Sequence, residues 1–112
     1  MITKIINKVA FARRVRQIKR YASHAAEIQQ EQFDALVHRA RRTAFGRQYG
    51  FSDAGFDYQR FSETVPLVTY DEIKPWIERM LQGEKNVLWP GLCKWFAKSS
   101  GTTSDKSKYI PV

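Results

Sequence analysis

The chain has 112 residues, which allows one domain at most, and its 43% hydrophobic content argues against wholesale disorder. Residues 1–48 hold eleven Lys and Arg against three acidic residues and so carry the whole net charge of +8, whereas residues 49–112 hold eight of each. No apolar run approaches the roughly 18 residues of a membrane-spanning helix, and a single cysteine, Cys93, excludes an internal disulfide. The N-terminus lacks the apolar core of a secretory signal, and a single cysteine fits a reducing compartment, so we expect a cytoplasmic protein.

A basic helix is predicted over residues 3–22. Phe11, Val15, Ile18 and Ala22 recur at spacings of three and four, which places them on one helix face, and we expect this face to pack inward. The excess of basic residues leaves two other functions open: a nucleic-acid-binding module, or a helix lying on an anionic membrane surface. The docked helix is favoured over both, and nucleic acid is not the expected partner, because no known nucleic-acid-binding motif is evident.

A second helix is predicted over residues 25–43. Its last turn is basic, and Gly46 is expected to end it. His24 and His38 have no cysteine or carboxylate at metal-ligand spacing, so no metal site is expected among the protein side chains. The predicted apolar side consists of Ile28, Phe33, Leu36, Val37 and Ala40.

Residues 46–68 are rich in Gly, Asp and aromatics and predict turns, with a short helix near 58–63. Thr69 and Glu72 fit a capping box that begins a third helix over residues 70–82. Pro75 predicts a kink in this helix, or a helix that starts only at the proline. The three tryptophans and Phe96 are more consistent with core positions than with a substrate wall.

The last segment predicts a short, largely buried strand over residues 92–97, followed by a loop over residues 98–108 that is rich in hydroxyls and lysines. Such a loop can hold phosphate, because backbone N–H groups and hydroxyls donate to its oxygens and lysine neutralises its charge. The P-loop pattern G-x-x-x-x-G-K-[ST] is not met, because Lys106 stands where the second glycine would follow Gly101. From composition alone, a flexible surface linker is the favoured interpretation.

Three longer stretches identify the loop more closely. They are "RTAFGRQYGF", "VPLVTYDEIKPWIERMLQGEKNVLWPG" and "KWFAKSSGTTSDKSKYIPV". Together they resemble the N-terminal region of the Gretchen Hagen, or auxin-responsive promoter, family of acyl-acid amido synthetases, which are adenylate-forming enzymes. The resemblance covers most of residues 25–112.

The resemblance implies a ligase that uses ATP and Mg²⁺ to adenylate a carboxylic acid and then transfers the acyl group to the amine of an amino acid. It also implies that the loop binds the β- and γ-phosphates of ATP, while no catalytic residue can be named. The implied phosphate-binding residues are Ser99, Ser100, Gly101, Thr102, Thr103, Lys106 and Lys108.

Two features depart from the family pattern. Asp105 stands where the family has glycine, and a carboxylate there would oppose a polyphosphate. Members of the family are also several times longer, so residues 1–112 are expected to be the N-terminal part of a large N-terminal domain. We therefore expect a mainly α chain, with three to four helices and a short strand, from a parent with an α/β adenylate-forming fold. Alone it is expected to be inactive, and its exposed apolar faces are expected to meet the rest of the parent chain or a second copy.

Overall fold

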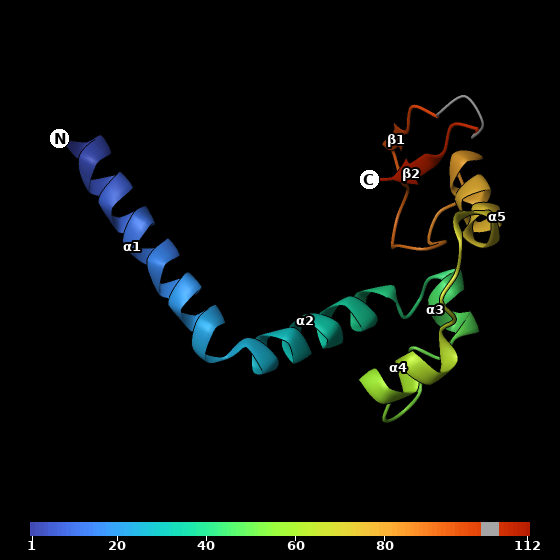
Figure 1. Ribbon diagram of the computed structural model, residues 1–112, viewed down its shortest axis with the longest axis horizontal. Helices are drawn as coiled ribbons and strands as arrows, with labels where there is room; N and C mark the ends of the chain where they lie inside the picture. The colour runs from blue at the N-terminus through green and yellow to red at the C-terminus, as the bar shows by residue number, and fades with distance from the viewer. Residues whose placement is uncertain (102–105) are drawn as a thin grey trace. The chain divides into compact units, whose positions relative to one another are not determined.

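The computed structural model describes residues 1–101 and 106–112, which form five helices and two short strands (Figure 1). The predicted mainly helical class is confirmed. The chain divides into two compact units, Met1–Asp34 and Ala35–Val112. The helices are α1 (Ile2–Ser23), α2 (Ala25–Ala40), α3 (Ala44–Gln48), α4 (Tyr58–Thr64) and α5 (Tyr70–Leu81), and the strands are β1 (Phe96–Lys98) and β2 (Tyr109–Pro111).

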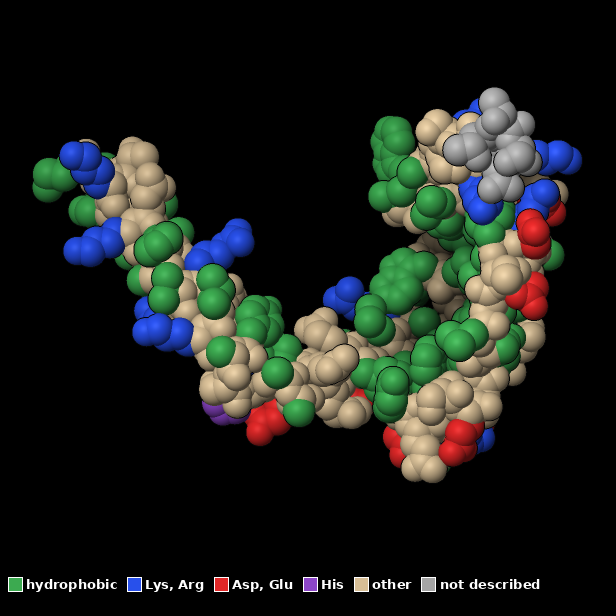
Figure 2. Space-filling model, in the orientation of Figure 1, with side chains coloured by type: hydrophobic (Ala, Val, Ile, Leu, Met, Phe, Trp, Pro, Cys, Tyr) green, Lys and Arg blue, Asp and Glu red, His purple; other side chains and the backbone are tan. Residues whose placement is uncertain are grey.

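The prediction that α1 packs an apolar face inward is wrong. All of α1 is described, and none of its residues is buried; Phe11 remains 72% exposed. The reason is that its apolar residues change face halfway along. Ile2, Ile5, Ile6 and Val9 share one face, but Phe11 follows Val9 by two residues, or about 200° of helix rotation. The apolar stripe that starts at Phe11 therefore lies opposite the first one, and Figure 2 shows apolar and basic side chains interleaved along α1.

The end of α2 also differs from the prediction. The helix stops at Ala40 instead of residue 43, and Gly46 lies inside α3 instead of ending α2. Thr43 produces this corner: its hydroxyl donates to the Ala40 carbonyl (2.7 Å) and accepts from the Gly46 N–H (3.0 Å), so it caps α3. The first two N–H groups of α3, from Ala44 and Phe45, donate to the carbonyls of residues 86 and 87.

Aromatic and aliphatic side chains build the core of the second unit. The predicted turns of residues 46–68 hold aromatic anchors: the ring centroids of Phe51 and Phe56 lie 5.1 Å apart. Phe45 of α3 packs edge to face on Trp76 of α5, with ring centroids 5.3 Å apart. The most deeply buried hydrophobic side chain is Val87, which is 1% exposed. Ala40, Phe51, Ile77 and Met80 are also buried.

Helix α5 runs without interruption through Pro75, so the alternative start at the proline is wrong. The predicted capping box is present: the Glu72 carboxylate accepts from the Thr69 N–H at 2.6 Å and from the Thr69 hydroxyl at 2.9 Å. The bond from the Thr69 N–H, and to a lesser extent the bond from its hydroxyl, holds the pKa of Glu72 below its usual value. The first turn of α5 therefore has a fixed start.

The C-terminal segment forms a hairpin that the sequence did not predict. Of the strand predicted over residues 92–97, only Phe96 and Ala97 are extended, in β1, which pairs antiparallel with β2 inside this chain. None of the residues of β1 is buried, so the prediction of a largely buried strand is wrong. The core positions expected for two tryptophans are wrong as well, because Trp95 is 75% and Trp89 42% exposed. Figure 2 shows hydrophobic side chains on the surface of this unit.

Candidate functional site

The hairpin fixes both ends of the hydroxyl-rich loop. The Ser99 N–H donates to the Lys108 carbonyl (2.9 Å), and the Lys108 N–H donates to the Ser99 hydroxyl oxygen (3.0 Å). Ser99 and Lys108 are thus paired across the base of the loop, and the side chain of Ser99 stabilises the hairpin. Ser100 and Gly101 are exposed, whereas Thr102 and Thr103, two of the predicted phosphate-binding residues, lie with Asp105 outside the described residues.

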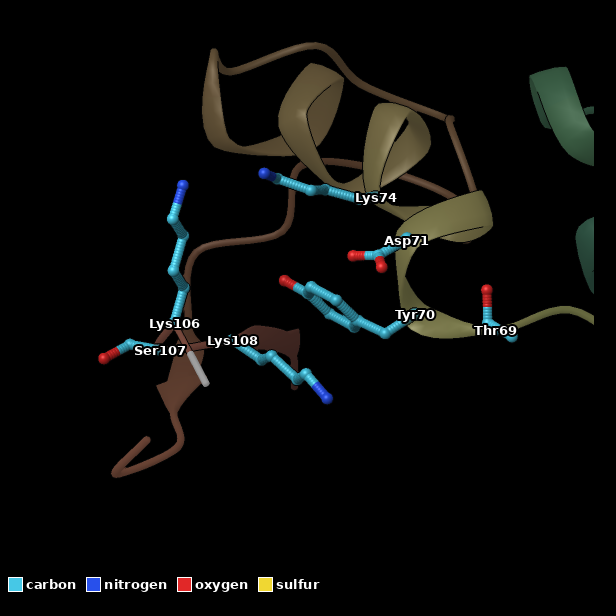
Figure 3. A pocket seen from close by; sticks show the side chains of 7 residues that line it. All are labelled: Thr69, Tyr70, Asp71, Lys74, Lys106, Ser107 and Lys108. Carbon is cyan, nitrogen blue, oxygen red and sulfur yellow. The ribbon is translucent and has the colours of Figure 1, made fainter. Parts of the chain in front are cut away.

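A hollow of about 400 Å³ lies between the closing end of this loop and the first turns of α5 (Figure 3). The loop contributes Lys106, Ser107 and Lys108, of which the two lysines were predicted to bind phosphate. The start of α5 contributes Thr69, Tyr70, Asp71 and Lys74. Three lysines against one carboxylate make the described lining positively charged, as binding of a polyphosphate requires.

Tyr70 connects the two walls of this hollow. Its hydroxyl donates to the carbonyl of Tyr109 (3.0 Å) and accepts from the N–H of Tyr109 (2.9 Å). The Lys108 ammonium lies 5.5 Å from the centre of the Tyr70 ring. In Figure 3 the side chains of Lys74 and Lys106 extend to the same side of the hollow.

Sequence reasoning did not place Tyr70, Asp71 or Lys74 at the site. Tyr70 and Tyr109 are 39 residues apart, and no motif joins them. The capping box predicted where α5 begins, but a local motif cannot indicate which distant segment the helix contacts. Lys74 also forms an i,i+4 ion pair with Glu78 at 3.7 Å, a surface pair that contributes little stability.

Among the described residues, no group of three His, Cys, Asp or Glu side chains could hold a metal ion. No helix in the described part of the chain combines the length and apolar character needed to cross a membrane.

The basic helix α1 is a second candidate surface. A shallow groove along it is lined by aliphatic side chains together with Arg13 and Arg14, and Arg20 is paired with Glu31 at 3.2 Å. Because its two apolar stripes face opposite ways, α1 cannot lay one continuous apolar face on a flat membrane. The membrane alternative is therefore weakened, while the nucleic-acid alternative needs a direct test.

We expect random duplex DNA to bind only at low salt and to be released near physiological salt, because the contacts of α1 would be confined to exposed phosphate-neutralising side chains. A fluorescence-anisotropy titration over a salt series measures this. The control variant, with Arg13, Arg14 and Arg16 replaced by Gln, should remove the low-salt binding. Tight binding that persists near physiological salt would favour the nucleic-acid alternative instead.

Comparison with known proteins identifies the family. Residues 14–112 match the family model described as the GH3 family N-terminal domain. This match covers most of the chain, so the chain belongs to the GH3 family, and the Gretchen Hagen resemblance is confirmed.

Curated relatives are similar over most of this chain. It is 26% identical over 112 residues to the jasmonoyl–L-amino acid synthetase JAR6 of Nicotiana attenuata, and the aligned region covers 99% of this chain and 19% of that protein. It is 32% identical over 94 residues to the indole-3-acetic acid-amido synthetase GH3.15 of Arabidopsis thaliana, covering 80% of this chain and 15% of that protein. It is 28% identical over 97 residues to the 4-substituted benzoates-glutamate ligase GH3.12 of the same plant, covering 86% and 16%. The chain spans less than a fifth of the length of each of these relatives.

Proposed function

We propose that the chain is the N-terminal part of a cytoplasmic, ATP-dependent acyl-acid amido synthetase. This longer enzyme adenylates a carboxylic acid with release of pyrophosphate and then transfers the acyl group to an amino acid amine with release of AMP. By their names, JAR6 and GH3.12 join an acid to an amino acid, and GH3.15 is an amido synthetase of indole-3-acetic acid. The observation that carries the proposal is the lysine-lined hollow at the closing end of the loop.

The residues around the hollow suit the first chemical step. When the carboxylate oxygen attacks the α-phosphorus, negative charge grows on the departing pyrophosphate, and groups placed beside that charge lower the barrier. Lys106, Lys108 and Lys74 supply positive charge, while the hydroxyl of Ser107 can donate a hydrogen bond.

Mg²⁺ accompanies ATP in this proposal. A Mg²⁺ shared with phosphates needs only one or two protein carboxylates. Asp71 is the carboxylate among the described lining residues, so the donor set fits a metal held mainly by the nucleotide. Bound there, the ion would share the charge of the departing pyrophosphate.

The proposed partners follow from the same surface. The substrates are ATP, a carboxylic acid and an amino acid. An apolar hollow of about 350 Å³ lined by Trp89, Leu92, Trp95 and Val112, among others, suits packing against the rest of a longer chain or self-association. Taken alone, residues 1–112 are proposed to be inactive, since the remaining nucleotide and acyl contacts would come from elsewhere.

The direct test measures pyrophosphate release by the longer protein with ATP and a panel of carboxylic acids. We expect release that depends on the acid, followed by amide and AMP formation once amino acids are added. Release of ADP, or ATP turnover that is indifferent to every acid, would contradict the proposal.

Replacing Asp105 by Gly should leave acid-dependent pyrophosphate release equal or higher. The substitution removes a carboxylate that opposes polyphosphate and frees the backbone at that position. The measurement is the initial rate against ATP concentration, with Asp57→Gly as a matched exchange far from the loop in sequence. A clear loss of activity confined to Asp105→Gly would mean that the carboxylate serves the reaction, for instance through Mg²⁺.

A further inference from the structure

A side chain from α5 satisfies the outward-facing backbone groups of Tyr109 in β2. In an antiparallel pair, every second residue directs its N–H and C=O groups away from the partner strand. Ser99 bonds to Lys108, and the Val112 N–H donates to the Trp95 carbonyl, so Lys108 and Val112 face β1. The N–H and C=O of Tyr109 therefore face outward. Pro111 is the next outward-facing residue, and as a proline it has no N–H that could be left unpaired.

Tyr70 occupies the place where a further strand would pair with Tyr109. Its hydroxyl bonds both the N–H and the C=O of Tyr109, so one phenol oxygen satisfies both outward groups. The backbone of Tyr70 is itself held, because it is the first residue of α5, directly after the Thr69 cap that bonds to Glu72. The chain of contacts thus runs from the capping box through Tyr70 to the residue beside Lys108.

We propose that Tyr70 is a positioning residue of the nucleotide site: its hydroxyl fixes β2 against α5, and its ring supports Lys108 at the phosphate-binding end of the loop. The proposal rests on the proposed function, since it assigns Tyr70 a part in holding the β- and γ-phosphates. Lys108 immediately precedes the bonded Tyr109, and its ammonium lies over the Tyr70 ring, so both contacts limit where this charge can be. Without the hydroxyl, the closing end of the loop keeps its bonds to Ser99 and the ring contact of Lys108, but it loses both hydrogen bonds between Tyr109 and α5.

The test compares Tyr70→Phe with Tyr109→Phe. Both remove one phenol hydroxyl, but Tyr70→Phe removes both bonds to the strand edge, whereas Tyr109 takes part through its backbone and keeps both when its side chain changes. In the longer protein we expect Tyr70→Phe to weaken ATP and pyrophosphate binding about tenfold, and AMP binding hardly at all, because AMP lacks the phosphates held by the loop. Tyr109→Phe should bind all three as the unsubstituted protein does. Isothermal titration with each ligand gives the constants.

A second measurement does not depend on nucleotide. Hydrogen exchange of the Tyr109 amide should become about tenfold faster in Tyr70→Phe and stay unchanged in Tyr109→Phe. Faster exchange with unchanged ATP binding would reduce Tyr70 to a structural contact and overturn the proposal, as would equal losses for ATP and AMP. If the unsubstituted protein fails to bind ATP, the proposed function is wrong, and so is the role of Tyr70 in phosphate binding. Hydrogen exchange then still shows whether Tyr70 holds β2.

Discussion

The Gly46→Ala variant should lose at least about 3 kcal/mol of unfolding free energy, at the upper end of what overpacking a core costs. Helix propensity alone predicts the opposite sign, because alanine is better than glycine inside a helix by about 1 kcal/mol. The steric term dominates here. A Cβ at Gly46 would lie 2.1 Å from the Ala40 carbonyl oxygen and 3.1 Å from the Cα of Arg41. These are backbone atoms, so no side-chain rotation relieves the overlap.

The surroundings of this corner prevent an easy shift. The Ala40 carbonyl accepts from the Thr43 hydroxyl and from the Thr43 N–H, and Thr43 is 1% exposed. Moving the carbonyl away from a new methyl group would break these bonds in a buried place, which is itself costly. The measurement is urea unfolding of the chain, followed by circular dichroism and tryptophan fluorescence.

Gly55→Ala is the matched control. Gly55 has φ +73°, a conformation that disfavours alanine by about 1 kcal/mol, but nothing lies within 4 Å of its added Cβ. The comparison therefore separates backbone strain from steric overlap. A Gly46→Ala variant no less stable than Gly55→Ala would show that the corner between α2 and α3 is not as close as described.

The features that the sequence predicted are the local ones. The capping box of Thr69 and Glu72 involves residues three apart. An amphipathic helix can be predicted from the apolar spacing within a few turns. Each depends on neighbours along the chain, so a pattern of residue types is sufficient to predict it.

The features that were missed depend on distant contacts. Gly46 was expected to end a helix because glycine often does so. In the structure, glycine is required there because a Cβ would overlap the Ala40 carbonyl at the corner between α2 and α3. The apolar residues of α1 from Phe11 onward share one face, but Ile2, Ile5, Ile6 and Val9 lie on the opposite face, so the helix has no single stripe along its whole length. At the site, composition predicted only a loop, and the family resemblance implied that it binds phosphate, whereas Tyr70 and Lys74 reach the site only through folding.

The second large effect concerns the loop itself. Replacing Ser100 and Thr102 together by Ala in the longer protein should slow acid-dependent pyrophosphate release by a factor of about 10²–10³, equivalent to about 2.7–4 kcal/mol in the barrier. That is the typical loss for one preorganised donor aimed at developing charge, and the effect will be smaller if the loop orders only when ATP binds. Ser100 is described and exposed, whereas Thr102 lies outside the described residues, so the expectation for Thr102 comes from the family resemblance and its chemistry.

A control with the same residue types and spacing exists elsewhere in the chain. Ser62 and Thr64 lie on α4, and their hydroxyls donate to backbone carbonyls of that helix. The Ser62→Ala and Thr64→Ala double variant removes as many hydroxyls and should release pyrophosphate at the unsubstituted rate. In the unsubstituted protein these hydroxyls stabilise the charge that grows as pyrophosphate departs. The loop variant loses that stabilisation, so it should have a lower maximal rate and not only a lower affinity for ATP. If the loop variant instead matches the α4 variant at saturating ATP, the hydroxyls hold nothing in the transition state, and residues 98–108 are only the linker that their composition first suggested.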